Sequence, residues 1–155
     1  MAITDVELNI VSDGLTTATT AYTAGDCLDN VHTATGFASA NGGTGLITNV
    51  TLIDDGDVLC ATTLYVFNAT VSVTDNAAFA PSDTDADNIL HEINIPWPAD
   101  LGSNRMAQAL KDGPWPFKCG GSTTALFFVL VTRSANAVFA AVDDIHLRFD
   151  VTQTS

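Results

Sequence analysis

Basic residues are scarce in this sequence. It has five Lys and Arg residues against 18 Asp and Glu, and its formal net charge at pH 7 is −13. A nucleic-acid-binding protein needs cations to replace phosphate counterions, and a peripheral membrane protein needs them to bind anionic lipids. We therefore expect neither a nucleic acid nor a membrane among the partners of this chain.

Glutamate and lysine, which are good helix formers, are almost absent. All acidic residues except Glu7 and Glu92 are Asp, a residue that favours turns and caps, and the only lysines are Lys111 and Lys118. Threonine, by contrast, is abundant, and its β-branched side chain suits a half-buried sheet surface. This composition predicts an all-β protein with many turns.

Cysteine is also rare. Cys27, Cys60 and Cys119 are odd in number and have no metal-ligand spacing, so we expect buried free thiols rather than a disulfide scaffold.

The most apolar run, residues 125–131, is too short to span a bilayer as a helix. The N-terminus resembles no signal peptide, so we expect the protein either to be made and used in a reducing cytoplasm or to leave the cell by lysis rather than secretion.

Apolar residues recur in the patterns of β-strands. In residues 145–151 every second residue, from Ile145 to Val151, is apolar, which predicts a strand with one buried face. Residues 59–68 are apolar on both faces, which predicts a strand covered on both sides. In residues 89–95, Ile89, Ile93 and Ile95 are expected on one face. The stronger predicted strands are 3–11, 46–54, 59–68, 89–95, 123–133 and 145–151, and the weaker ones are 16–24 and 135–142.

Turn and loop residues separate these strands. The acidic turn at 54–57 is of the type found in hairpins, and residues 33–45 and 75–88 are predicted loops. Residues 100–111 are the best candidate for a short helix, because Met106 and Leu110 lie four apart. About eight antiparallel strands with long loops favour one β-sandwich domain over residues 1–155, of the jelly-roll type.

Alternating carboxylates at Asp83, Asp85 and Asp87 resemble the start of a calcium-binding loop. The match is incomplete, because position 88 is Asn instead of Gly and no later Glu could close the site. Two interpretations therefore stand: a divalent metal site, or a solvated acidic loop.

No catalytic motif stands out. His32, His91 and His146 lack the spacing of a zinc site. No nucleophile elbow or phosphate-binding glycine loop is present, although a Ser-His-Asp triad is recognised by geometry rather than by sequence. We expect no enzymatic activity and no cofactor.

Three aromatic residues are candidates for an interface. Trp97 and Trp115 stand beside prolines, which limit their motion, so they suit either an interface or the plug of an open sandwich end. Phe37 is the one large apolar residue of the glycine-rich loop at 33–45. That loop is either plainly solvated or an arm that orders on a partner.

Three segments together resemble a family of small virion proteins of tailed bacteriophages. They are AYTAGDCLDN (21–30), GLITNVTLIDDG (45–56) and the stretch from LYVFNATVSV to HEINI (64–95). The stretches AYTAGD and TDNAAFAPSD carry most of the specificity. Such family members often have a second glycine just after the first motif, where this chain has Leu28 and Asp29.

The resemblance implies a capsid decoration or cement protein. Such a protein sits on the outer surface of the phage head, binds the major capsid protein, often forms a homotrimer and stabilises the shell. The interface residues would then be Phe37, Trp97 and Trp115. The alternative is a carbohydrate-binding jelly-roll module on the virion surface, in which tryptophans stack on sugars beside acidic, calcium-binding loops.

Overall fold

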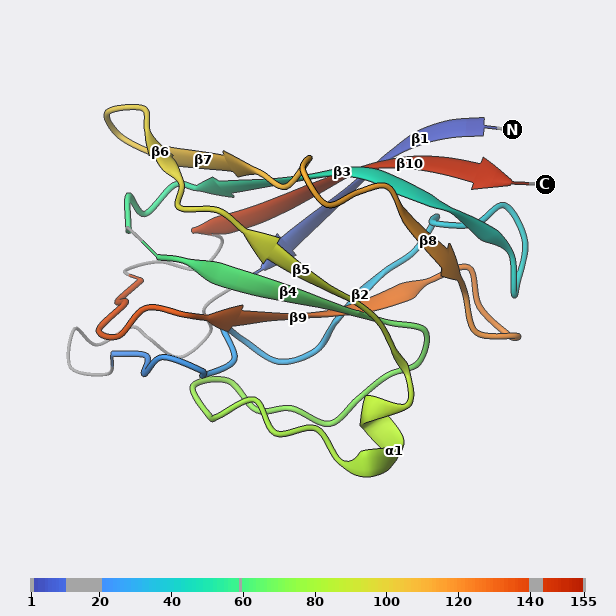
Figure 1. Ribbon diagram of the computed structural model, residues 1–155, viewed down its shortest axis with the longest axis horizontal. Coiled ribbons are helices and arrows are strands. Elements are labelled where there is room, and N and C mark those ends of the chain that lie inside the picture. The colour runs from blue at the N-terminus through green and yellow to red at the C-terminus, as the bar shows by residue number, and fades with distance from the viewer. Residues whose placement is uncertain (1, 11–20, 59, 140–143, 155) are drawn as a thin grey trace.

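Two antiparallel sheets form the fold in the computed structural model, which describes residues 2–10, 21–58, 60–139 and 144–154 (Figure 1). The larger sheet has the spatial order β1 (Ala2–Ile10), β10 (Ile145–Thr154), β3 (Thr44–Asp54), β7 (Arg105–Gln108) and β6 (Ala99–Asp100), and β8 (Trp115–Lys118) also pairs with β3. The smaller sheet has the order β2 (His32–Ala34), β9 (Leu126–Thr132), β4 (Thr62–Phe67) and β5 (Ile89–Ile95).

This architecture confirms the all-β prediction. Most predicted strands are present, but the sheets contain six and four strands rather than about eight in total. The expected jelly-roll connectivity stays a prediction. The one helix among the described residues is a single turn, α1 (Asp83–Ala86), and none of them forms a helix long and apolar enough to cross a membrane.

β10 is an inner strand of the larger sheet, and it pairs with β1 on one side and with β3 on the other. Its side chains alternate as predicted, with Ile145, Leu147, Phe149 and Val151 buried. These residues face the smaller sheet across one apolar core, in which the rings of Phe128 and Phe149 lie 4.7 Å apart between centroids.

The smaller sheet is covered on its outer face as well. Phe67, Val129 and Val131 form a second apolar cluster there, packed against the partly buried Phe79. In Figure 1 the loop that leads from β4 to α1 lies below this sheet and forms a third layer over part of it. This covering explains why β4 is apolar on both faces, as the sequence predicted.

A β-bulge changes one prediction for β5. The register shifts between Val66 and Phe67, which pair with His91 and Ile89 and leave Leu90 as the extra residue. Ile89 therefore packs in the outer cluster, whereas Ile93 and Ile95 are in the inner core. The prediction that all three isoleucines share one face was wrong, because one inserted residue reverses the alternation.

The predicted helix at 100–111 was also wrong. The segment forms the hairpin of β6 and β7, and its turn is fixed by Gly102, whose φ is +108° and whose N–H donates to Asp100 Oδ1 at 2.7 Å. Along β7 and the two residues after it, the buried Ala107 and Ala109 alternate with the exposed Met106, Gln108 and Leu110. The spacing of four between Met106 and Leu110 is thus also compatible with a period of two.

The acidic turn at 54–57 does not close a hairpin. β3 and β4 belong to different sheets, so the chain crosses the sandwich here. Of the two weaker strand predictions, 16–24 and 135–142, the described parts contribute only an isolated bridge between Tyr22 and Ala137. Residues 16–20 and 140–142 lie outside the described residues.

Candidate interaction surface

The three histidines of the chain each contact a carboxylate or a backbone carbonyl. The imidazole of His32 lies 3.2 Å from Asp29, and that of His146 lies 3.1 Å from Asp55. His91 contacts the backbone carbonyl of Pro116 instead. Within the described ranges, no group of three His, Cys, Asp or Glu residues is placed to hold a metal ion.

The predicted metal ligands Asp83, Asp85 and Asp87 are not brought together. They lie on and just after α1, whose N-cap Ser82 accepts a hydrogen bond from the Asp85 N–H at 3.1 Å. Asp85 lies two residues from each of the other two, and residues two apart on a helix point to nearly opposite sides. The described residues thus give the metal-site interpretation no support, and the alternation gives a helix turn with acidic side chains near its positive end.

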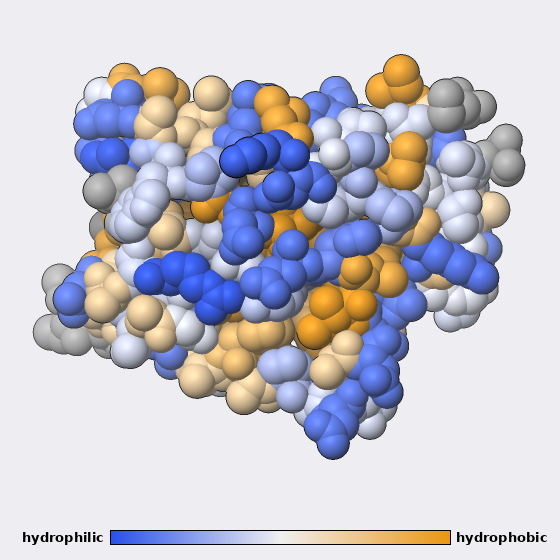
Figure 2. All heavy atoms as spheres, viewed as in Figure 1, coloured by the Kyte–Doolittle hydropathy of each residue, from blue (hydrophilic) through white to orange (hydrophobic). Residues whose placement is uncertain are grey.

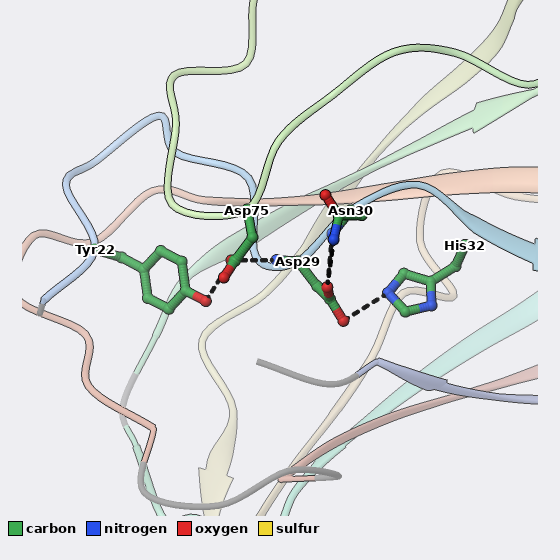
Figure 3. A network of polar contacts seen from close by, with 5 residues as sticks. All are labelled: Tyr22, Asp29, Asn30, His32 and Asp75. Carbon is green, nitrogen blue, oxygen red and sulfur yellow. Dashed lines mark hydrogen bonds and ion pairs between the residues drawn. The ribbon is translucent and has the colours of Figure 1, made fainter. Parts of the chain in front are cut away.

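A partly buried network of polar residues links the two stretches on which the resemblance was based (Figure 3). The Tyr22 hydroxyl donates to Asp75 Oδ1 at 2.7 Å, and the Asp29 N–H donates to the same atom at 2.9 Å. Asp29 Oδ1 accepts from the Asn30 N–H at 2.7 Å, and its other carboxylate oxygen faces His32. This network joins residues that lie 46 to 53 positions apart, and no local sequence pattern indicates such a contact.

The network keeps the hydroxyl group of Tyr22 protonated and does not activate it as a nucleophile. Desolvation by burial, followed by the hydrogen bond to Asp75, raises the pKa of Tyr22 far above its usual range. The phenol therefore stays a hydrogen-bond donor. Backbone bonds strengthen the same junction: the Cys27 N–H donates to the Ala77 carbonyl at 2.9 Å, and the Asn76 N–H donates back to the Cys27 carbonyl at 3.0 Å. The junction thus fixes the fold.

The three cysteines are free and buried, as expected. Burial raises the pKa of each thiol, and the pKa of Cys27 reaches about 11 because the carboxylates of Asp26 and Asp75 add to the desolvation. A protonated, buried thiol is a poor nucleophile. These cysteines are therefore core residues rather than reactive groups.

Phe37 and Trp115 are core residues in this structure, so the prediction that they are surface contacts was wrong for both. Phe37 is 0% exposed, and its ring centroid lies 5.3–5.7 Å from those of Phe117, Phe128 and Phe149. Trp115 is 5% exposed on β8. The loop at 33–45 is thus anchored by the packing of Phe37 inside the protein.

Exposed large apolar side chains concentrate instead between residues 97 and 110. Trp97 is 60% exposed, Leu101 59% and Leu110 56%, and Met106 is also exposed. We call these four residues the 97–110 surface. Only one other large apolar residue of the described chain, Ile3, is exposed. In Figure 2, hydrophobic atoms interrupt the polar surface around the end of the molecule where Figure 1 places β6 and β7.

Polar contacts anchor the hairpin that carries part of this surface. The Arg105 guanidinium lies 2.9 Å from Asp57 Oδ1 and 3.6 Å from Asp100 Oδ2. β7 also pairs with β3 from Thr51 to Asp54. The exposed side chains therefore belong to a hairpin whose backbone need not reorganise when a partner binds, and this reduces the entropic cost of association.

A pocket of about 220 Å³ opens beside the 97–110 surface, where the end of β5 meets the chain that follows β7. Its base is fixed to the larger sheet, since the N–H of the buried Ala109 donates to the Val50 carbonyl at 2.8 Å. The lining residues are Asn94, Pro96, Gln108, Ala109, Lys111 and Asp112.

Comparisons with known proteins assign no family. No protein-family model matches this chain, and no curated protein matches its sequence. The function must therefore be argued from the surface itself.

Proposed function

We propose that this protein is a structural component of a bacteriophage particle, a decoration protein that binds the outer surface of the head and stabilises the shell. The 97–110 surface is the observation that carries the proposal. Groups of exposed large apolar side chains on a protein surface mark sites of interaction with partners or ligands. The resemblance of segments 21–30, 45–56 and 64–95 to phage virion proteins supports the same function.

The physical basis of the proposed role is buried area. A leucine side chain contributes roughly 1.5–3 kcal/mol when it is fully buried, so Leu101 and Leu110 both favour coverage by a partner. A protein that bridges neighbouring subunits of the major capsid protein adds this contact energy to the shell. No chemical step is required, and the acidity of the chain disfavours binding to the packaged DNA.

Self-association into a homotrimer is part of this proposal. Three identical heterologous contacts can close a ring, and a trimer binds a shell through several sites at once, which raises its avidity. Each copy carries a net charge of −13, so an apolar seam is needed to offset the repulsion between copies.

The test begins with phage particles from a genome that encodes this chain. Deletion of its gene should leave heads that release DNA, measured with a fluorescent dye, at a lower temperature than wild-type heads. Added purified protein should restore the stability, and the variant Leu101→Ser should restore it less well. An exposed polar substitution elsewhere, Ser122→Ala, is the matched control. Unchanged head stability after deletion would refute the proposal.

A further inference from the structure

The 97–110 surface presents a sulfur-bearing side chain to solvent. Met106 is 38% exposed, whereas the three cysteines of the chain are at most 4% exposed. The only other methionine, Met1, lies outside the described residues. Among the residues that the structure describes, Met106 is therefore the one sulfur-bearing side chain that a small oxidant in solution reaches without a local opening of the fold.

Met106 belongs to an apolar row on the outer face of the larger sheet. It pairs with Ile53 of β3 on one side and with Ala99 of β6 on the other. Side chains of directly paired residues lie on the same face of a sheet, with Cβ atoms about 4.5–5.5 Å apart. The next residue, Ala107, is buried in the core between the sheets, so Met106 points away from it. Its thioether therefore stands among apolar side chains at the surface.

A thioether reacts with hydrogen peroxide without first losing a proton. A lone pair of the Met106 Sδ atom attacks one peroxide oxygen, an S–O bond forms while the O–O bond breaks, and the other oxygen leaves as water. The sulfur is oxidised to a sulfoxide and the peroxide is reduced. Thiols react as thiolates, and burial raises the pKa of all three thiols in this chain. Hydrogen peroxide should therefore oxidise Met106 before any cysteine.

The product changes the surface and leaves the core as it is. An unmodified methionine is an adaptable apolar contact for a partner, whereas its sulfoxide is polar. We propose that Met106 is a modification site at which a peroxide adds one oxygen atom, and that the sulfoxide weakens the association of the 97–110 surface with apolar partners. Only the identity of one such partner, the phage shell, rests on the proposed function.

The experiment starts from the purified full chain, treated with hydrogen peroxide in native buffer. Peptide mass spectrometry should locate the added oxygen on Met106 and find the three thiols unmodified. On a phenyl column the oxidised protein should elute earlier than the untreated protein, and methionine sulfoxide reductases with dithiothreitol should restore the original elution. The affinity for phage heads that lack this protein should fall about tenfold on oxidation.

Two variants separate this residue from other effects of peroxide. Met106→Leu retains an apolar side chain of similar size without the thioether, so its elution and its head binding should not respond to peroxide. Met106→Gln is polar at the same position, and it should elute early and bind heads weakly without any treatment. Thermal unfolding verifies that both variants are folded, which we expect because the side chain is exposed.

Three results would overturn the inference. They are oxidation of a cysteine before Met106, the same elution before and after complete oxidation of Met106, and an equal response of Met106→Leu to peroxide. The decoration role fails in a different way. If the untreated protein does not bind heads, that role is refuted, whereas a reversible shift in elution that depends on Met106 still supports the modification site.

Discussion

The buried carboxyl group of Asp54 predicts an unusual dependence of stability on pH. Asp54 lies at the end of β3, where the chain leaves the larger sheet. Desolvation raises its pKa from 3.8 to about 6, although the N–H groups of Gly56, at 3.0 Å, and Val58 donate to it and lower the pKa. The carboxylate of Asp144 raises the pKa further, and the guanidinium of Arg105 lowers it.

The sign of the effect follows from the direction of this shift. A carboxyl group with a higher pKa in the folded state binds its proton more tightly there, so folding is favoured at low pH and loses this contribution as the pH rises through about 6. The difference from 3.8 corresponds, at about 1.4 kcal/mol per tenfold change in proton affinity, to about 3 kcal/mol at neutral pH. The substitution Asp54→Asn removes the charge and retains an acceptor for the Gly56 N–H.

The assay is urea unfolding of the wild type and Asp54→Asn at several pH values from about 4.5 to 7.5. We expect the variant to be more stable by up to about 3 kcal/mol at the upper end, and this advantage to shrink as the pH falls below about 6. Asp112→Asn, at an exposed position, makes the same change in net charge and controls for general repulsion. A destabilised variant, or an advantage that is independent of pH, would refute the reasoning.

Three further predictions concern the core, the buried network and α1. Phe37→Ala should lower the free energy of unfolding by about 3–5 kcal/mol, because it removes a ring that contacts three other aromatic rings. Chemical unfolding measures this loss. A loss below about 1 kcal/mol would show that the packing of Phe37 is not needed to anchor its loop. Tyr22→Phe removes the hydrogen bond to Asp75 and should cost about 1 kcal/mol in the same measurement, whereas equal stability would mean that water replaces the hydroxyl. For the proposed homotrimer, light scattering of the purified protein should give a mass near three times 16.2 kDa with or without a chelator, because the described residues form no metal-binding cluster. Dissociation by the chelator would contradict this expectation and favour a metal site.

The parts of the fold that the sequence predicted are those with regular, local patterns. β10 alternates without interruption, and β9 is a continuous apolar run, so their existence and burial follow from periodicity alone. The failures have local causes as well. A single-residue bulge reversed the face of Ile89, and the hairpin turn at Gly102 replaced a helix that rested on the spacing of two apolar residues.

The candidate site was only partly predictable, for a different reason. Trp97 was singled out because it lies between two prolines, but Trp115 has nearly the same context and is buried. The difference between them is tertiary, since Trp115 lies in a strand paired with β3 and Trp97 lies on the connection between sheets. The sequence does not indicate the side-chain hydrogen bonds of the pocket-lining residues Asn94 and Gln108, because their partners Thr63 and Thr51 are distant in the sequence.

The residues that carry the expected resemblance to phage virion proteins are not the residues of the proposed binding surface. The stretches that carry the specificity of this resemblance, in 21–30 and 74–83, are joined to each other by backbone bonds and by the Tyr22–Asp75 contact, so they specify a junction inside the fold. The 97–110 surface and most of the pocket lining come after the last of those segments. Proteins that share the junction could therefore keep this sandwich while differing in the connection that follows β5. A fold alone does not determine function, so in such proteins the binding partner should change with residues 96–112. Transplanting that connection from a protein with the same junction is then expected to transfer its binding specificity while leaving the unfolding free energy nearly unchanged.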